Sequence, residues 1–124
     1  MRATELATVR HEARESSVIA TLEGEVDTSN AAVVRDEIIR VMSNDALGLV
    51  VDLSAARYFD SAGIQMLFAL GERLNARGQT LSVCAPPDGL LRGTLDLFEM
   101  DRVIPLADSV EEGLVFVKTS RTSL

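Results

Sequence analysis

The sequence predicts an α/β fold in which about four helices pack on a mixed, mostly parallel β-sheet. Short apolar runs rich in β-branched residues alternate with segments whose apolar residues recur at helical spacing. The chain opens with two strand-like segments that have no helix between them, which makes the sheet mixed. With 124 residues and 47% hydrophobic content, the chain is expected to form a single domain over residues 1–124. Its core is expected at about residues 6–117.

The N-terminal third is predicted to contain two strands and one helix. Alternating apolar and polar residues place the strands at 6–12 and 17–22. Gly24 then allows a turn, and one of the polar residues at 27–30 caps a helix that runs to about residue 42. The helix carries an apolar stripe formed by Val34, Ile38, Val41 and Met42.

The middle of the chain reads as a buried strand, a tight corner and a second helix. The strand covers the apolar run 49–53, which suits a position with both faces covered. After the corner, Leu67, Leu70 and Leu74 follow helical spacing, and the helix is predicted to stop near Gly78. This spacing places Ser61 at or next to the helix N-terminus.

The C-terminal third is predicted to add two strands and two helices. A strand at 79–85 leads through the turn at 86–88 into a third helix that carries Leu91, Leu95 and Phe98. The run 102–106 contains a proline and is therefore assigned to a strand at a sheet edge. Asp108 and Ser109 open a final helix whose inner face carries Val110, Leu114 and Val117, and residues 119–124 are expected to form a loose tail.

The corner before the second helix is the strongest candidate for a functional site. The first-turn N–H groups of Ala62, Gly63 and Ile64 are expected to lack intrahelical partners, and the helix dipole adds partial positive charge there. A phosphate on Ser61 would lie beside these donors, and the small residues that follow leave room for a partner. Asp60 has two candidate roles, capping the helix or positioning Ser61. A helix cap is also the commoner meaning of Asp-Ser-Ala-Gly taken alone.

Charge and hydropathy exclude several classes of function. With 12 basic and 19 acidic residues, the formal net charge is −7, and aromatic residues make up only 4%. This composition argues against nucleic-acid binding. No apolar run approaches the ~20 residues of a spanning helix, and the N-terminus lacks the apolar segment of a signal peptide. We therefore expect a soluble, cytoplasmic protein without a membrane partner.

The reactive side chains argue against catalysis, metal binding and cofactors. Cys84 is the only cysteine and His11 the only histidine, so neither a disulfide nor a zinc cluster can form. No G-x-S-x-G elbow surrounds Ser61. A response-regulator receiver is the nearest rival fold, with Asp52 as phosphate acceptor, but the only lysine is Lys118, near the end of the chain. We expect no enzyme activity and no cofactor.

The chain resembles STAS domains of the bacterial anti-sigma factor antagonist type over residues 18–117. The resemblance is carried by the motif Phe-Asp-Ser-Ala-Gly at 59–63, by Leu-Glu-Gly-Glu-Val-Asp at 22–27 and by the order of the elements. It implies the STAS fold and a phosphorylation site at Ser61, the serine that follows the motif Asp. It also implies that Asp27 lies near that site. Many relatives carry a second Ser or Thr where this chain has Ala62, so one hydroxyl is left in the motif.

The resemblance implies a partner-switching mechanism in the control of a sigma factor and of stress-response transcription. The unphosphorylated protein would bind an anti-sigma factor that is also a serine kinase and thereby release a sigma factor. Phosphorylation of Ser61 would end binding, and a protein phosphatase would restore it. The expected partner-binding residues are Asp27, Asp60, Ser61, Ala62, Gly63 and Ile64.

Two alternatives belong to other functional classes. The chain could be a STAS scaffold subunit of a larger stress-signalling assembly. It could also be a nucleotide or small-ligand module that uses the helix N-terminus at Ser61 as an anion site, although no glycine-rich phosphate loop is present.

Overall fold

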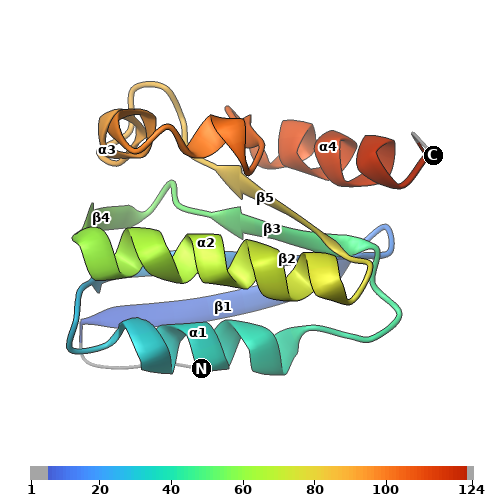
Figure 1. Ribbon diagram of the computed structural model, residues 1–124, viewed down its shortest axis with the longest axis horizontal. Coiled ribbons are helices and arrows are strands. Elements are labelled where there is room, and N and C mark those ends of the chain that lie inside the picture. The colour runs from blue at the N-terminus through green and yellow to red at the C-terminus, as the bar shows by residue number, and fades with distance from the viewer. Residues whose placement is uncertain (1–5, 123–124) are drawn as a thin grey trace.

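The computed structural model describes residues 6–122, with side chains up to residue 119, and shows one six-stranded sheet flanked by helices (Figure 1). The sheet order is β1-β2-β3-β5-β6, and β4 lies beside β2. All strand pairs are parallel except β1–β2. The strands are β1 (Ala7–Arg14), β2 (Ser17–Val26), β3 (Gly48–Asp52), β4 (Ala56–Phe59), β5 (Thr80–Cys84) and β6 (Leu106–Ala107). The predicted α/β class with a mostly parallel sheet is confirmed.

The helices also follow the predicted order. They are α1 (Ala31–Val41), α2 (Ser61–Ala76), α3 (Arg92–Leu97) and α4 (Val110–Thr122), and the 3-10 turn η1 (Met100–Arg102) follows α3. Helix α4 includes the first four residues of the expected loose tail, 119–122. The remainder of that predicted tail, residues 123–124, lies outside the described residues.

The opening hairpin is tighter and longer than predicted. Arg14 pairs with Ser17, so Glu15 and Ser16 alone form the turn. Both turn residues have positive φ angles, 52° and 69°. This left-handed geometry suits a two-residue hairpin because its twist matches that of the strands. The longer β2 reaches Val26 and therefore carries the chain directly to the Asp27 turn.

Strand β2 has two parallel partners along one of its edges. Its first half pairs with β3, and its last residues, Gly24–Val26, pair with β4. Gly24 has φ 101°, and a Cβ atom there would lie 2.1 Å from the carbonyl oxygen of Leu6, so glycine is required. The sequence does not predict β4, because it indicates only a tight corner between the apolar run 49–53 and the second helix. Its pairing with β2 fixes the position of Asp60, the residue that follows it.

Helices cover the two faces of the sheet in separate layers. Helices α1 and α2 lie side by side on one face, where they bury the main core, and α4 lies on the other (Figure 1). Between α4 and the sheet lies a smaller apolar cluster of Ile19, Val50, Cys84, Leu114 and Val117. The N-termini of α1 and α2 lie at the same end of the molecule, next to β4. The layers thus bring the two predicted functional turns to one end.

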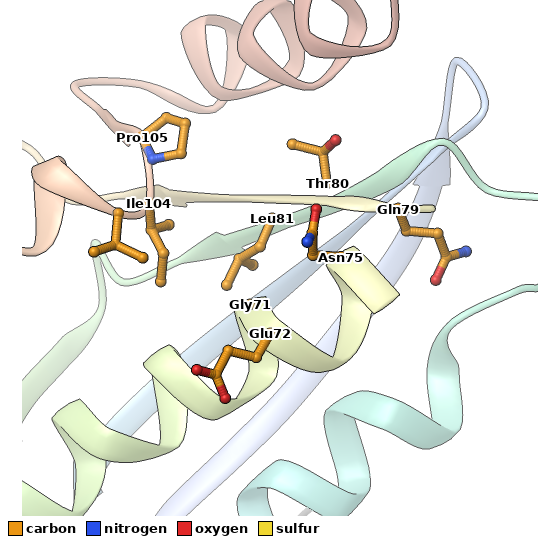
Figure 2. A pocket seen from close by; sticks show the side chains of 9 residues that line it. Gly71, Glu72, Asn75, Gln79, Thr80, Leu81, Ile104 and Pro105 are labelled. Carbon is orange, nitrogen blue, oxygen red and sulfur yellow. The ribbon is translucent and has the colours of Figure 1, made fainter. Parts of the chain in front are cut away.

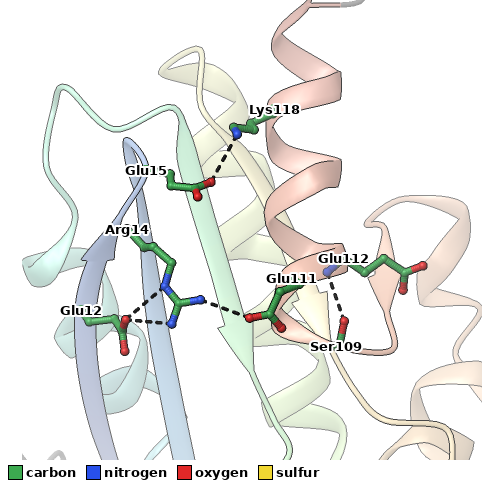
Figure 3. A network of polar contacts seen from close by, with 7 residues as sticks. All are labelled: Glu12, Arg14, Glu15, Ser109, Glu111, Glu112 and Lys118. Atoms are coloured by element: carbon green, nitrogen blue, oxygen red, sulfur yellow. Dashed lines mark hydrogen bonds and ion pairs between the residues drawn. The ribbon is translucent and has the colours of Figure 1, made fainter.

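Ion pairs join α4 to the opening hairpin on the surface. Arg14 bonds to Glu12 and to Glu111, at 3.0 and 3.3 Å, and Lys118 lies 3.2 Å from Glu15 (Figure 3). All of these side chains are at least one-third exposed. Such exposed pairs contribute little free energy, so the apolar cluster is the main attachment of α4.

Two predictions in the C-terminal third are wrong in detail. Helix α3 covers Arg92–Leu97, so Leu91 and Phe98 are its cap residues and do not lie within it. The strand predicted at 102–106 contains only Leu106 of that range, because η1 and a turn occupy the residues before it. Its predicted place at a sheet edge is confirmed, since β6 is the last strand of the sheet.

Candidate functional site at the α1 and α2 N-termini

Two turns far apart in sequence meet at one end of the sheet. Val26, the last residue of β2, pairs with Phe59, the last residue of β4. The chain leaves β2 into the Asp27 turn and leaves β4 into the Ser61 corner. The N–H of Asp60 donates to the carbonyl of Val26 at 3.1 Å, which extends this pairing to the first residue of the corner. Parallel strands thus place both turns at their shared carboxyl end.

The Asp60 carboxylate joins the two turns. Its Oδ1 accepts hydrogen bonds from the N–H groups of Ala62 at 2.8 Å and Gly63 at 3.2 Å, which makes Asp60 the N-cap of α2. Its Oδ2 accepts a hydrogen bond from the N–H of Thr28 at 3.3 Å. The capping role proposed for Asp60 is therefore observed, and the same side chain also holds the neighbouring turn.

The Asp27 turn is held by its own polar side chains. Asp27 Oδ1 accepts hydrogen bonds from the N–H and the hydroxyl of Ser29, at 2.9 and 2.5 Å. Both bonds lower the pKa of Asp27, and the bond from the hydroxyl has the larger effect. The carboxylate therefore stays charged at neutral pH. Asn30 is the N-cap residue of α1, but its side chain points back and bonds to the N–H of Asp27 and the carbonyl of Glu25.

The predicted site residues differ in what they present to a partner. Ser61 is exposed, whereas Asp27, Asp60 and Ala62 are half-buried. Gly63 is buried, and a Cβ atom there would lie 2.7 Å from the Phe59 ring. Ile64 is 1% exposed and belongs to the main core. The side chains available at the surface are therefore Ser61 and the two carboxylates, while Gly63 and Ile64 support them from below.

The N–H groups beside Ser61 all have partners, but only that of Ile64 has an intrahelical backbone partner, contrary to the expectation. Asp60 Oδ1 occupies the N–H groups of Ala62 and Gly63, and the carbonyl of Asp60 accepts the N–H of Ile64 at 3.1 Å. The sequence showed a possible cap, but it could not show that one carboxylate oxygen binds two donors. A phosphate on Ser61 would have to compete with Asp60 for these groups.

A groove between α1 and α2 continues from the two turns. Its volume is about 310 Å³, and its walls carry small side chains, among them Ala31, Ala32, Ala62 and Ala69. Thr28 lines the end near the Asp27 turn, and Met66 also lines the groove. The sequence alone does not reveal this groove. Its signal was the alanines at the start of both helices, which leave space where larger side chains would fill it.

Cys84 lies away from these turns and is not available for reaction. Its side chain is buried under α4. Burial, together with the nearby carboxylate of Asp52, raises the pKa of the thiol to about 12. The neutral thiol acts as a small apolar side chain, as the sequence suggested.

None of the helices within residues 6–122 is long and apolar enough to cross a membrane.

Comparison with known proteins places the fold and the two turns in a family. The family model for the STAS domain matches residues 8–113 of this sequence. Osmosensory protein A of Mycobacterium tuberculosis is 32% identical over 100 residues, which are 79% of this chain and 63% of that protein. This chain therefore spans less than two-thirds of the length of that relative. The anti-sigma-F factor antagonist RsfB of the same species is 27% identical over 104 residues, 83% of each protein.

A solved structure supports the same assignment. The crystal structure of an anti-sigma factor antagonist from Mycobacterium paratuberculosis is 25% identical to this chain and superimposes with a TM-score of 0.80. The match covers 95% of this chain and 99% of the other. Because the family model covers both turns and nearly every strand and helix, this chain belongs to the STAS domain family.

Proposed function

We propose that this protein is an anti-sigma factor antagonist whose binding is switched by phosphorylation of Ser61. One observation carries the proposal: Ser61 is exposed at a firmly capped corner that also presents the carboxylates of Asp60 and Asp27. The similarity to RsfB over 83% of both proteins supports this class of function. The protein would act by binding in the cytoplasm, without catalysis.

The partner is an anti-sigma factor with serine kinase activity. When Ser61 is unmodified, the partner would contact the Asp27 turn, Ser61 and the groove between α1 and α2. The alanines of the groove allow close approach, and the two turns are already ordered by side-chain hydrogen bonds. A surface that is ordered before binding loses less conformational entropy when the partner docks. Docking would displace the sigma factor from the anti-sigma factor.

Phosphorylation would oppose docking mainly through charge. A phosphoserine carries roughly −1.5 to −2 charges at neutral pH. Asp60 already occupies the nearest helix N–H groups, so the domain offers a phosphate on Ser61 little compensation. The phosphate would add to the charges of Asp60 and Asp27 on the surface that the partner must cover. A protein phosphatase acting on phospho-Ser61 would then restore binding.

The test measures the affinity of Ser61 variants for the kinase partner. This partner is first captured from the native cells with the parent protein. Ser61→Ala should bind the partner as the parent does and accept no phosphate. Ser61→Asp should weaken binding at least about tenfold, or ~1.4 kcal/mol. Ser109→Asp is the matched control, because Ser109 caps the N–H of Glu112 in α4 on the opposite face of the sheet. Equal affinities of Ser61→Asp and Ser109→Asp would disprove the switch.

Mass spectrometry of protein from growing and stressed cells tests the modification itself. A phosphate on the peptide that contains Ser61, together with a co-purifying kinase, is expected under one of the two conditions. Unmodified Ser61 under both conditions, with no kinase bound, would contradict the proposal and leave Asp60 and Ser61 as a helix cap.

A further inference from the structure

One edge of β5 is only half covered by its neighbour. β6 pairs with β5 at Val83 and Cys84 alone. The N–H of Val83 donates to Pro105 and that of Ala85 to Ala107, whereas the N–H of Thr80 points the other way, to Leu47 beside β3. Because successive peptide groups point to opposite sides of a strand, the N–H and C=O of Leu81 face the side of β6. They lie beyond the last rung of that ladder.

Pro105 explains why the ladder stops there. In the observed register, the next donor toward the carbonyl of Leu81 would be the nitrogen of Pro105, which carries no hydrogen. The chain before it turns away, since the N–H groups of Val103 and Ile104 both donate to the carbonyl of Met100, at 2.9 and 2.8 Å. Among the described residues, no strand therefore pairs with the first half of the β5 edge, while Leu81 and Ser82 themselves are only 5% and 0% exposed.

A cavity of about 430 Å³ lies at this open edge. Figure 2 shows Glu72 and Asn75 of α2 on one side of it, Ile104 and Pro105 on the other, and Leu81 between them. The open rungs run alongside Thr80–Ser82, which span about 10 Å of strand. The cavity thus combines an open strand edge with walls from a helix and a loop.

The walls define the chemistry of an occupant. Val103, which is 69% exposed, provides an apolar wall. Ile104 is buried and fills the space beside Gly71, where a Cβ atom would lie 3.3 Å from its Cδ1. Glu72 is exposed at the rim, and its carboxylate forms no ion pair within the described part of the chain. In an extended partner segment, side chains two residues apart point to the same face. An apolar side chain would therefore contact the Val103 wall, and a basic side chain two residues away would reach the Glu72 carboxylate.

We propose that this cavity binds an extended segment of a partner protein by strand addition to β5, with an apolar side chain against Val103 and a basic one at Glu72. The peptide groups of Leu81 supply the backbone hydrogen bonds, and the two side chains supply selectivity. The site lies on the third and fourth turns of α2, away from Ser61 at its first residue. It is independent of the function proposed for Ser61.

The test uses the purified protein and the peptide acetyl-Thr-Val-Thr-Lys-Thr-amide, followed by ¹⁵N NMR titration. Saturable shifts are expected at the amides of Gly71, Leu81 and Val103. Peptides N-methylated at one residue each should lose about fivefold in affinity at one position only, because Leu81 offers a single free carbonyl to a peptide N–H. No saturable shift at any soluble concentration, or N-methylation without effect at every position, would overturn the proposal.

Variants of the protein test the part played by charge. Glu72→Arg should weaken binding of the lysine peptide at least about fivefold and strengthen binding of the matching glutamate peptide. Asp88→Arg makes the same charge change in the turn beyond the other end of β5 and should leave both affinities unchanged. Equal effects of the two substitutions would show general charge attraction and contradict a site at Glu72.

Discussion

Asp60 connects three parts of the chain through one side chain. Its carboxylate caps α2 at Ala62 and Gly63 and reaches Thr28 in the other turn. Each contact uses a backbone N–H group, so the carboxylate orders main chain on both sides of Ser61. The position of the serine hydroxyl is therefore set mainly by its neighbour in sequence.

Replacing Asp60 should separate these two contributions. Asp60→Ala removes both and is expected to lower the free energy of unfolding by about 1 to 2 kcal/mol. Asp60→Asn keeps an oxygen for the helix cap but presents an amide NH₂ group to the N–H of Thr28, so its loss should be smaller. Urea denaturation of the two variants measures the difference. An equal loss in both would assign the effect to the Thr28 contact, contrary to the capping argument.

Gly63 is required by packing beneath the corner. A Cβ atom at this position would lie 2.7 Å from Cδ2 and 2.9 Å from Cγ of Phe59. Gly63→Ala should therefore destabilise the protein by about 1 to 3 kcal/mol. Gly93→Ala is the matched control, because a Cβ atom at Gly93 in α3 meets nothing within 4 Å. Thermal unfolding that shows equal stability for the two variants would contradict the packing argument.

Among the strands and helices, those with strong periodicity were predictable from the sequence. The apolar run at 49–53 gave β3, and the stripe of Leu67, Leu70 and Leu74 gave α2. β4 has only four residues, two of them exposed, so it carries no apolar pattern of its own. It exists because β2 continues past β3 and offers a free edge, which is tertiary information.

The residues of the candidate site could be predicted, but the hydrogen bonds that join them could not. The motif at 59–63 identified the corner, and the polar residues at 27–30 identified the other turn. The contact between Thr28 and Asp60, and the occupation of two N–H groups by one oxygen, depend on the pairing of β2 with β4. The strand predicted at 102–106 is wrong for a related reason. Pro105 ends the ladder between β5 and β6 only because of its register against β5, which is tertiary information.

Helix α4 should be held to the sheet by its apolar face. Leu114 is 6% exposed and packs in the cluster with Ile19 and Val50, so Leu114→Ala should cost about 2 to 4 kcal/mol of stability. Glu111→Ala removes an exposed pair with Arg14 and should cost less than about 1 kcal/mol. Urea denaturation at low and high salt compares them. A larger loss for Glu111→Ala would show that the ion pairs hold the helix.

The two proposed binding regions both lie along α2 but at separate places in the layers. The Ser61 corner lies at the carboxyl end of β2 and β4, whereas the cavity beside Leu81 lies along the first half of β5. Positions 61 and 72 are separated by about 16 Å of helix, at 1.5 Å per residue. The main core between them includes Leu67 and Leu70, both fully buried.

Binding at the two regions should therefore be additive. Ser61→Asp should leave the affinity for the lysine peptide unchanged, and Glu72→Arg should leave the affinity for the kinase partner unchanged. In the double variant, the two effects should add within about 0.3 to 0.5 kcal/mol, as distant sites with no shared contacts do. Calorimetric titration of the parent, the single variants and the double variant measures this. A larger coupling energy would mean that α2 moves as a unit when either region is occupied. The buried face of α2 would then not be packed rigidly on the sheet.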